Sequence, residues 1–206
     1  VAPNPDIIPT ATIGIPVARS YTITNLFGAF TGRAQGTALG SAFLDTPTIA
    51  HHAFQIFEVT VPAGATSLRA TIGSPSDPAA DLDLFVFRPN GTLAGQSADG
   101  DSEESVTIAN PVAGTWTILV DGFSVPAGTT TYNYVDVFAN PAFGSVSVTD
   151  ADALRPAGTM WTVPGTVTAN AAPAAGRVLL GNVQVITDAN VLIGFNNVIV
   201  QSVVTP

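Results

Sequence analysis

Apolar and polar residues alternate along most of this chain, and the alternation predicts β-strands. In residues 81–87, Leu82, Leu84 and Val86 fall on one face of an extended chain, while Asp81 and Asp83 fall on the other. Comparable alternation or short apolar runs predict further strands at residues 17–25, 54–61, 68–72, 106–108, 116–120, 132–138, 146–148, 161–168, 177–186, 191–193 and 198–203.

Proline and glycine mark the reversals between these runs. Pro89 ends the run at 81–87 and Asn90-Gly91 predicts a hairpin turn, because both residues tolerate positive φ. Pro62-Ala63-Gly64 and Pro126-Ala127-Gly128 repeat a turn signal in which Pro presets φ and Gly closes the turn. No window carries helical spacing with caps. The fold class predicted is all-β: an antiparallel jelly roll or β-sandwich together with a second β-sandwich.

Three stretches predict less regular structure. Residues 1–16 contain four prolines and are expected to form a linker or an edge strand. Residues 27–40 are expected to form an irregular strand plus loop, and residues 41–50 a connector. The opening Val1-Ala2-Pro3 is typical of a mature or excised piece of a longer protein.

Composition narrows the classes of partner. Charged residues make up 10% of the 206 residues, and the net charge is −9 with no lysine. An acidic chain without clustered Lys/Arg argues against nucleic acid and against an anionic membrane surface. It favours a cation as partner, or a solvated acidic surface. The absence of cysteine excludes disulfides and thiolate chemistry and suits a secreted, extracellular bacterial protein.

Three motifs in order resemble the bacterial pre-peptidase C-terminal domain. They are the strand and turn at 57–64, the Asp-x-Asp-Leu strand at 81–86, and the Gly-Thr-aromatic strand at 114–120. Phe85 and Trp116 stand where that family often has tyrosine. The resemblance covers roughly residues 50–140 and implies a jelly roll.

The flanks resemble fibronectin-III-like segments at the C-termini of actinobacterial subtilisin-like (S8) serine proteases. We therefore expect residues 1–50 and 141–206 to form one discontinuous fibronectin-III-like sandwich, with residues 51–140 as the inserted jelly roll. Two consecutive domains are the alternative. Pairing between residues 17–37 and 144–203 would distinguish the two arrangements.

The motifs of a subtilisin-like triad are absent, so the chain is not expected to be an enzyme. No Gly-Thr pair is followed by Ser, and the two histidines are the adjacent His51 and His52. Adjacent residues on a strand point to opposite faces, so this pair is also poorly placed to chelate one metal ion.

The acidic residues are the best candidates for chemistry. Asp81, Asp83, Asp99 and Asp101 could bind Ca²⁺, provided that the loop at 99–104 converges on the strand, because Ca²⁺ takes six to eight oxygens. Asp77 or loop carbonyls could complete the set. Glu103 and Glu104 break the EF-hand pattern. A solvated acidic edge that discourages aggregation explains the same residues without a metal.

Several functions remain open at this stage. The resemblance implies a non-catalytic accessory region of a secreted subtilisin-like protease, for substrate docking, stabilisation or maturation, with the protease catalytic domain as partner in the parent chain. A calcium-ordered adhesive module is the second hypothesis. A collagen- or carbohydrate-binding module is the third; its ligand would be a protein or polysaccharide, and exposed Tyr132 and Tyr134 could form its platform if they do not instead cover the core.

Overall fold

The computed structural model describes residues 5–206, which divide into two compact units. Unit 1 combines the N-terminal residues up to Ser41 with Asn140–Pro206, and unit 2 comprises Ala42–Ala139. From the sequence, we expected the changes of domain at 50/51 and 140/141, and the two units change at 41/42 and 139/140. Residues 1–4, part of the expected linker and of the opening segment, lie outside the described residues.

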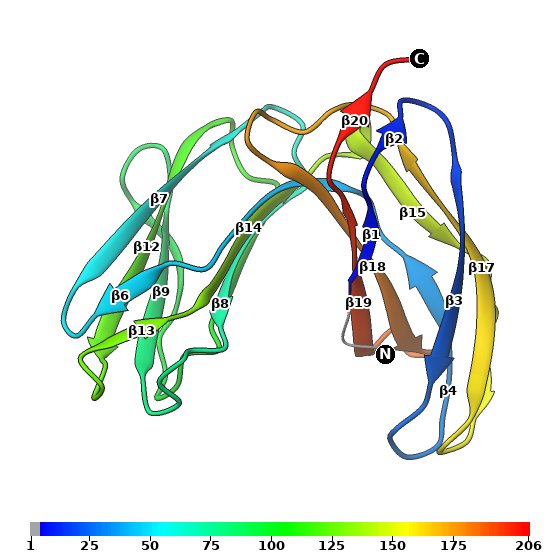
Figure 1. Cartoon of the computed structure of the whole chain (residues 1–206), viewed down its shortest axis with the longest axis horizontal. Helices are drawn as coiled ribbons and strands as arrows, with labels where there is room; N and C mark the ends of the chain where they lie inside the picture. The colour runs from blue at the N-terminus through cyan, green and yellow to red at the C-terminus, as the bar shows by residue number, and fades with distance from the viewer. Residues whose placement is uncertain (1–4) are drawn as a thin grey trace. The chain divides into compact units, whose positions relative to one another are not determined.

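Unit 1 is built from N-terminal and C-terminal strands that pair with one another (Figure 1). One sheet has the order β15-β17-β3, and the other contains β1-β19-β18-β4-β16. The strands are β1 (Asp6–Ile8), β2 (Ala11–Thr12), β3 (Val17–Thr24), β4 (Phe30–Gly36), β15 (Gly144–Val148), β16 (Ala153–Arg155), β17 (Met160–Ala169), β18 (Val178–Thr187), β19 (Leu192–Val200) and β20 (Val203–Val204). β3 pairs with β17 over eight residues and β4 pairs with β18, so the pairing between residues 17–37 and 144–203 is present. The fibronectin-III-like character of this unit stays a prediction.

Unit 2 has two antiparallel sheets and a short strand pair. One sheet has the order β14-β8-β11, the second β10-β9-β12-β7, and β6 pairs with β13. The strands are β6 (Thr48–Ala50), β7 (Phe54–Val61), β8 (Ser67–Gly73), β9 (Asp81–Phe87), β10 (Leu93–Ser97), β11 (Ser105–Ala109), β12 (Gly114–Ser124), β13 (Thr129–Thr131) and β14 (Asn133–Ala139). β5 (Gly40–Asp45) contains the boundary between the units. The all-β, sandwich-like class predicted from the sequence is confirmed.

The buried residues of the strands follow the alternation of apolar and polar residues predicted from the sequence. β9 is buried at Leu82, Leu84 and Val86 and half-buried at the residues between them. The hairpin after β9 is also present, but its geometry differs from the expected one. Gly91 N–H donates to Arg88 C=O and Gly91 alone takes a positive φ, of 79°, so Pro89 and Asn90 form the corner.

Three expectations about strands were wrong. Residues 41–50 contain β5 and β6 instead of a connector, and 191–193 and 198–203 are not separate strands, because residues 192–200 form the single strand β19. The predicted antiparallel pattern has two exceptions, since β1 pairs with β19 and β2 with β20 in parallel. The only helical element in residues 5–206 is a single 3₁₀ turn, Pro141–Phe143. In that range no helix has the length and apolar character needed to span a bilayer.

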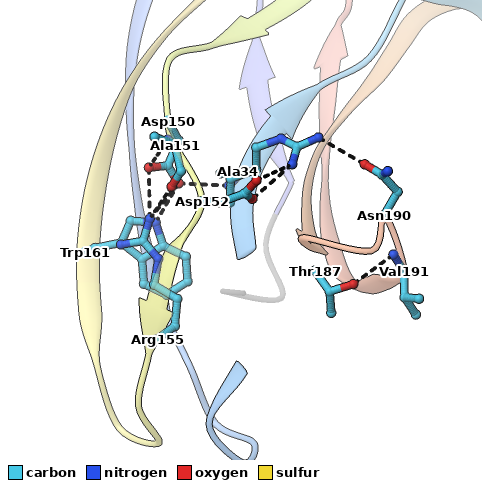
Figure 2. A network of polar contacts seen from close by, with 10 residues as sticks. Ala34, Asp150, Ala151, Asp152, Arg155, Trp161, Thr187, Asn190 and Val191 are labelled. Atoms are coloured by element: carbon cyan, nitrogen blue, oxygen red, sulfur yellow. Dashed lines mark hydrogen bonds and ion pairs between the residues drawn. The ribbon is translucent and has the colours of Figure 1, made fainter. Parts of the chain in front are cut away.

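A half-buried polar network fixes one edge of unit 1 (Figure 2). The Asp150 carboxylate accepts the N–H of Ala34 (2.8 Å), the indole N–H of Trp161 (3.1 Å) and the guanidinium of Arg155 (2.9 Å). Arg155 in turn lies over the Trp161 ring, 4.3 Å from its centroid. β16 pairs with β4 only as far as Gly32. The Asp150 carboxylate therefore accepts the backbone N–H of Ala34 at a position where β16 no longer pairs with β4.

Candidate functional site

The acidic residues of unit 2 gather at the start of β9 and in the loop between β10 and β11. Two hydrogen bonds tie this loop to the strand: Leu82 N–H donates to Asp101 C=O (3.2 Å), and the Ser102 hydroxyl donates to Ala80 C=O (2.7 Å). Ser102 is 1% exposed, so this anchor is part of the core. The convergence of loop and strand that the sequence analysis required is therefore present.

Three carboxylates meet in this loop. One oxygen from each of Asp99, Asp101 and Glu104 lies within 4.8 Å of the others. Asp99 and Asp101 are exposed, while Glu104 is only 2% exposed. The Glu104 carboxylate accepts hydrogen bonds from the Ser97 hydroxyl and from Asp99 N–H (3.1 Å). A carboxylate fixed in this way costs little further ordering when it binds a cation.

Asp81, at the start of β9, carries an unsatisfied carboxylate oxygen. Its Oδ1 is buried and has no hydrogen-bond partner among the described residues. Burial raises the pKa of Asp81, and the charges of Glu104, Asp99 and Asp101 raise it further. Leaving a buried carboxylate oxygen unpaired is unfavourable unless a proton or a cation satisfies it.

Asp83 lies on the same outer face of β9 but has different neighbours. It stands directly opposite Asp121 of β12. Burial, followed by the charges of Asp81 and Asp121, raises the pKa of Asp83 to about 6. Like charges placed opposite each other on a sheet destabilise the folded state.

The predicted metal ligands thus lie in different surroundings. Asp99 and Asp101 are brought together, Asp81 supplies the unpaired oxygen, and Asp83 lies beside Asp121. Asp77 caps a turn, where it accepts the N–H groups of Ala79 (3.1 Å) and Ala127 (2.9 Å). Glu104 was not among the candidate ligands predicted from the sequence, where it counted only as a departure from the EF-hand pattern. Glu104 falls on the same alternating positions as Ser102 and Val106, and all three residues are buried. This alternation is the sequence feature that could have identified Glu104.

This constellation is suited to a hard cation. All the candidate ligand atoms are carboxylate oxygens, which Ca²⁺ prefers. The unpaired Oδ1 of Asp81 is an atom of the same type. Asp99, Asp101 and Glu104 could contribute ligands to such an ion, and Asp81, loop carbonyls or water could supply the rest of the six to eight.

Asp83→Asn is expected to raise the melting temperature at pH 7 in calcium-free buffer. The folded protein binds a proton at Asp83 more tightly than the unfolded chain does, so the wild type loses stability as the pH rises from about 4 to about 6. The asparagine variant lacks this contribution, and its melting temperature should depend less on pH across that window. Thermal unfolding at pH 4.5 to 7.5 measures both effects, with Glu58→Gln as a control that removes an exposed charge of unit 2. Parallel pH profiles for wild type and Asp83→Asn would contradict the prediction.

The other candidate residues do not form sites of the expected kind. Tyr132 and Tyr134 are fully buried, so they offer no exposed platform for collagen or glycan. Their hydroxyls donate to Gln55 Oε1 (2.6 Å) and Asp136 Oδ2 (3.1 Å). His51 and His52 are exposed and lie in the turn between β6 and β7. The expectation that they point to opposite faces of a strand was wrong, since their ring centroids are 3.7 Å apart with the planes tilted by 34°.

Comparison with known proteins supports the resemblance for the central part of the chain. Residues 53–122, all of them in unit 2, match the family model of the Bacterial pre-peptidase C-terminal domain. Pyrolysin from Pyrococcus furiosus is 30% identical over 105 residues, which is 51% of this chain and 8% of pyrolysin. The chain therefore corresponds to a small part of that relative's length.

Similarity to solved structures is weaker. The periplasmic inhibitor of g-type lysozyme from Aeromonas hydrophila, PliG, is 15% identical with a TM-score of 0.35, covering 65% of this chain and 97% of that one. The Yersinia pseudotuberculosis-derived mitogen is 16% identical with a TM-score of 0.38, covering 48% of this chain and 86% of that one. Neither similarity carries a functional argument.

Proposed function

We propose that the chain is a non-catalytic accessory region of a secreted subtilisin-like serine protease. It would act in substrate docking, in stabilisation of the enzyme or in its maturation, with the protease catalytic domain of the parent chain as its partner. The observation that carries the proposal is the match of residues 53–122 to the pre-peptidase C-terminal domain, together with the similarity to pyrolysin, a subtilisin-like protease.

The residues of the chain support a role without chemistry of its own. The sequence lacks the three motifs that carry a subtilisin-like triad. Of the two histidines, His51 uses its Nδ1 to accept the backbone N–H of Val125 (2.9 Å), the nitrogen at which an orienting carboxylate would bind in a triad. Both features favour binding and stabilisation over catalysis.

The gene tests this proposal most directly. The reading frame upstream of Val1 is expected to encode the His-Gly-Thr, Asp-Ser/Thr-Gly and Gly-Thr-Ser motifs of the protease. A parent protein truncated before Val1 should then keep its activity on a small peptide substrate and lose activity on a bulky protein, or lose thermal stability. An upstream frame without those motifs would refute the proposal.

A second candidate function, a calcium-ordered module, is favoured by the three loop carboxylates and by the unpaired Oδ1 of Asp81, whose pKa the charges of those carboxylates help to raise. Ca²⁺ that binds only the folded state would stabilise it by about 2.7 kcal/mol at a free concentration one hundred times Kd. Titration with Ca²⁺ should therefore raise the melting temperature of the full chain by several degrees.

The matched variants for this prediction are Asp99→Asn, Asp101→Asn and Glu104→Gln, which should each reduce the calcium-dependent shift. Glu58→Gln removes the same charge from unit 2 outside the cluster and should leave the shift unchanged. If the wild type shows no shift in millimolar Ca²⁺, the acidic cluster is a solvated edge and this second function is excluded.

A further inference from the structure

The four-stranded sheet of unit 2 has an outer face that is apolar over several rows. In β7, β9 and β12, which lie side by side in Figure 1, buried residues alternate with residues that point away from the core. The strand registers place Ile56, Leu119 and Phe85 in one row across these strands. Phe54 lies two residues before Ile56, and Phe87 lies two residues after Phe85, so both share this face. We call these five residues the outer patch.

Water reaches much of the outer patch. Phe54 is 65% exposed and Ile56 is 55% exposed, while Phe85, Phe87 and Leu119 are half-buried. Adjacent apolar side chains left in water on one face of a sheet are typical of a surface that binds another molecule. The outer patch is therefore a candidate interface, and its polar border indicates which partner it suits.

The border of the outer patch is acidic. Asp121 on β12 stands between Phe54 on β7 and Asp83 on β9. Glu58 follows Ile56 on the same face of β7. The four strands of this sheet contain no lysine, arginine or histidine. All three ion pairs found in the described chain lie in unit 1, so within it these carboxylates have no ion-pair partner.

The pair formed by Asp83 and Asp121 lowers the stability of the unbound chain, because like charges directly opposite each other repel. Opposite residues on a sheet have Cβ atoms about 4.5–5.5 Å apart, so one planar guanidinium can bind both carboxylates. Ca²⁺ suits this pair less well, since it takes six to eight oxygens and the adjoining side chains of Phe54, Leu119 and Phe85 offer only carbon. An arginine fits both features, because its apolar stem packs on such surfaces while its head binds the carboxylates.

The same charges disfavour other occupants of the outer patch. In a two-fold dimer, a second copy of the chain would bring its own acidic border to this face, and the net charge of −9 opposes that association. An anionic membrane surface or a nucleic acid would meet three carboxylates. A small cation would leave the apolar rows in water. The remaining partner is a polypeptide that combines arginine with apolar side chains, a combination common at the centres of protein interfaces.

We propose that the outer patch docks an arginine-bearing segment of another protein. The guanidinium would lie between Asp83 and Asp121, and apolar side chains beside the arginine would cover Phe54, Ile56 and Leu119. The repulsion within the carboxylate pair would then be relieved on binding, so the pair reduces the stability of the free chain in favour of function. The inference deepens the proposed function, from which it takes only polypeptide as the class of partner.

The test titrates the ¹⁵N-labelled full chain with a blocked hexapeptide in which one arginine lies between two leucines and the other residues are threonine. The amide NMR signals of β7, β9 and β12 should shift. A matched peptide replaces arginine with citrulline, which keeps the shape of the side chain without its charge, and should bind at least about tenfold more weakly. Nα-acetylarginine amide has the charge without apolar neighbours and should also bind at least about tenfold more weakly.

Three variants separate charge, apolar contact and stability. Asp121→Asn should reduce the preference for arginine over citrulline to less than about threefold and also raise the melting temperature, so that lost binding cannot be attributed to unfolding. Ile56→Thr keeps a β-branched side chain at an exposed position and should weaken binding of both peptides about fivefold. Asp45→Asn removes the same charge from β5, which belongs to another sheet, and should leave binding unchanged.

Any of three results would overturn the inference: no shifts with the arginine peptide at millimolar concentration, equal binding of the arginine and citrulline peptides, or an Asp121→Asn variant that keeps the full preference for arginine. None of them bears on the link to a protease, which the upstream reading frame tests independently.

Discussion

Replacing Trp116 with alanine is expected to lower the free energy of unfolding by about 3–5 kcal/mol, the largest loss for a single residue of unit 2. Trp116 is 1% exposed and lies on β12, between β7 and β9. Its indole N–H donates to Val112 C=O (2.9 Å), so the alanine variant would lose both packing and a hydrogen bond. Because domains are stable by only about 5–15 kcal/mol, a loss of this size approaches the stability of the unit.

Urea denaturation followed by far-UV circular dichroism measures this loss. Trp116→Phe keeps much of the ring volume and loses the indole N–H, so it should cost clearly less than the alanine variant. Thr117→Ala, one residue along on the outer face of the same strand, should change stability by less than about 0.5 kcal/mol. A Trp116→Ala variant as stable as Thr117→Ala would show that this ring is not central to the core.

Asp150→Ala is expected to destabilise unit 1 by roughly 3 kcal/mol, because it leaves Arg155 as a buried charge without its partner. The side chains of Arg155 and Asp150 are only 12% and 11% exposed. The same substitution leaves the N–H of Ala34, which is 2% exposed, and the indole N–H of Trp161 without their acceptor (Figure 2). The expected cost thus combines an uncompensated charge with two unmet hydrogen bonds.

Asp152→Ala is the matched control for this substitution. Asp152 also pairs with an arginine, Arg33 (2.9 Å), but its side chain is 41% exposed. An exposed ion pair contributes at most about 1 kcal/mol, so the control should cost far less. Equal losses from the two variants, measured by urea denaturation, would contradict the role given to Asp150.

The pH dependence provides a second readout for Asp150. Burial alone would raise its pKa, but the N–H groups of Ala34 and Ala151, the Trp161 indole and the Arg155 charge outweigh burial and lower it. A carboxyl whose pKa is lowered by folding stabilises the protein above its unfolded pKa, and this contribution is lost as the pH falls below about 4. The difference in stability between wild type and Asp150→Ala should therefore shrink in acid.

The strands and their turns could be predicted from the sequence because alternation and turn chemistry are local properties. Leu82, Leu84 and Val86 specify an inner face by their spacing alone, and Gly91 and Gly128 mark turns because they tolerate positive φ. The same local rules produced the errors. Residues 191–193 and 198–203 were predicted as two strands, yet β19 continues through Gly194, Asn196 and Asn197, since pairing with β18 outweighs the weak strand propensity of these residues.

The candidate site was predicted only in part, for a similar reason. Asp99 and Asp101 stand out in the sequence, but Glu104 joins them because Ser102 anchors the loop to Ala80, a contact between residues 22 positions apart. The raised pKa of Asp83 depends on Asp121, which the register of β12 against β9 places opposite it.

By itself, the sequence determined that this protein is all-β, where the turns after β7, β9 and β12 fall, and which side of a strand such as β9 is apolar. Only the tertiary structure decided that residues from both ends of the chain share unit 1, and that the Asp150 carboxylate accepts hydrogen bonds from Ala34, Trp161 and Arg155 together. The physical reason is the distance along the sequence over which each kind of interaction acts. A side chain's face is set by the residues two positions away, whereas its neighbours across a sheet are set by the burial and hydrogen bonding of segments more than one hundred residues apart.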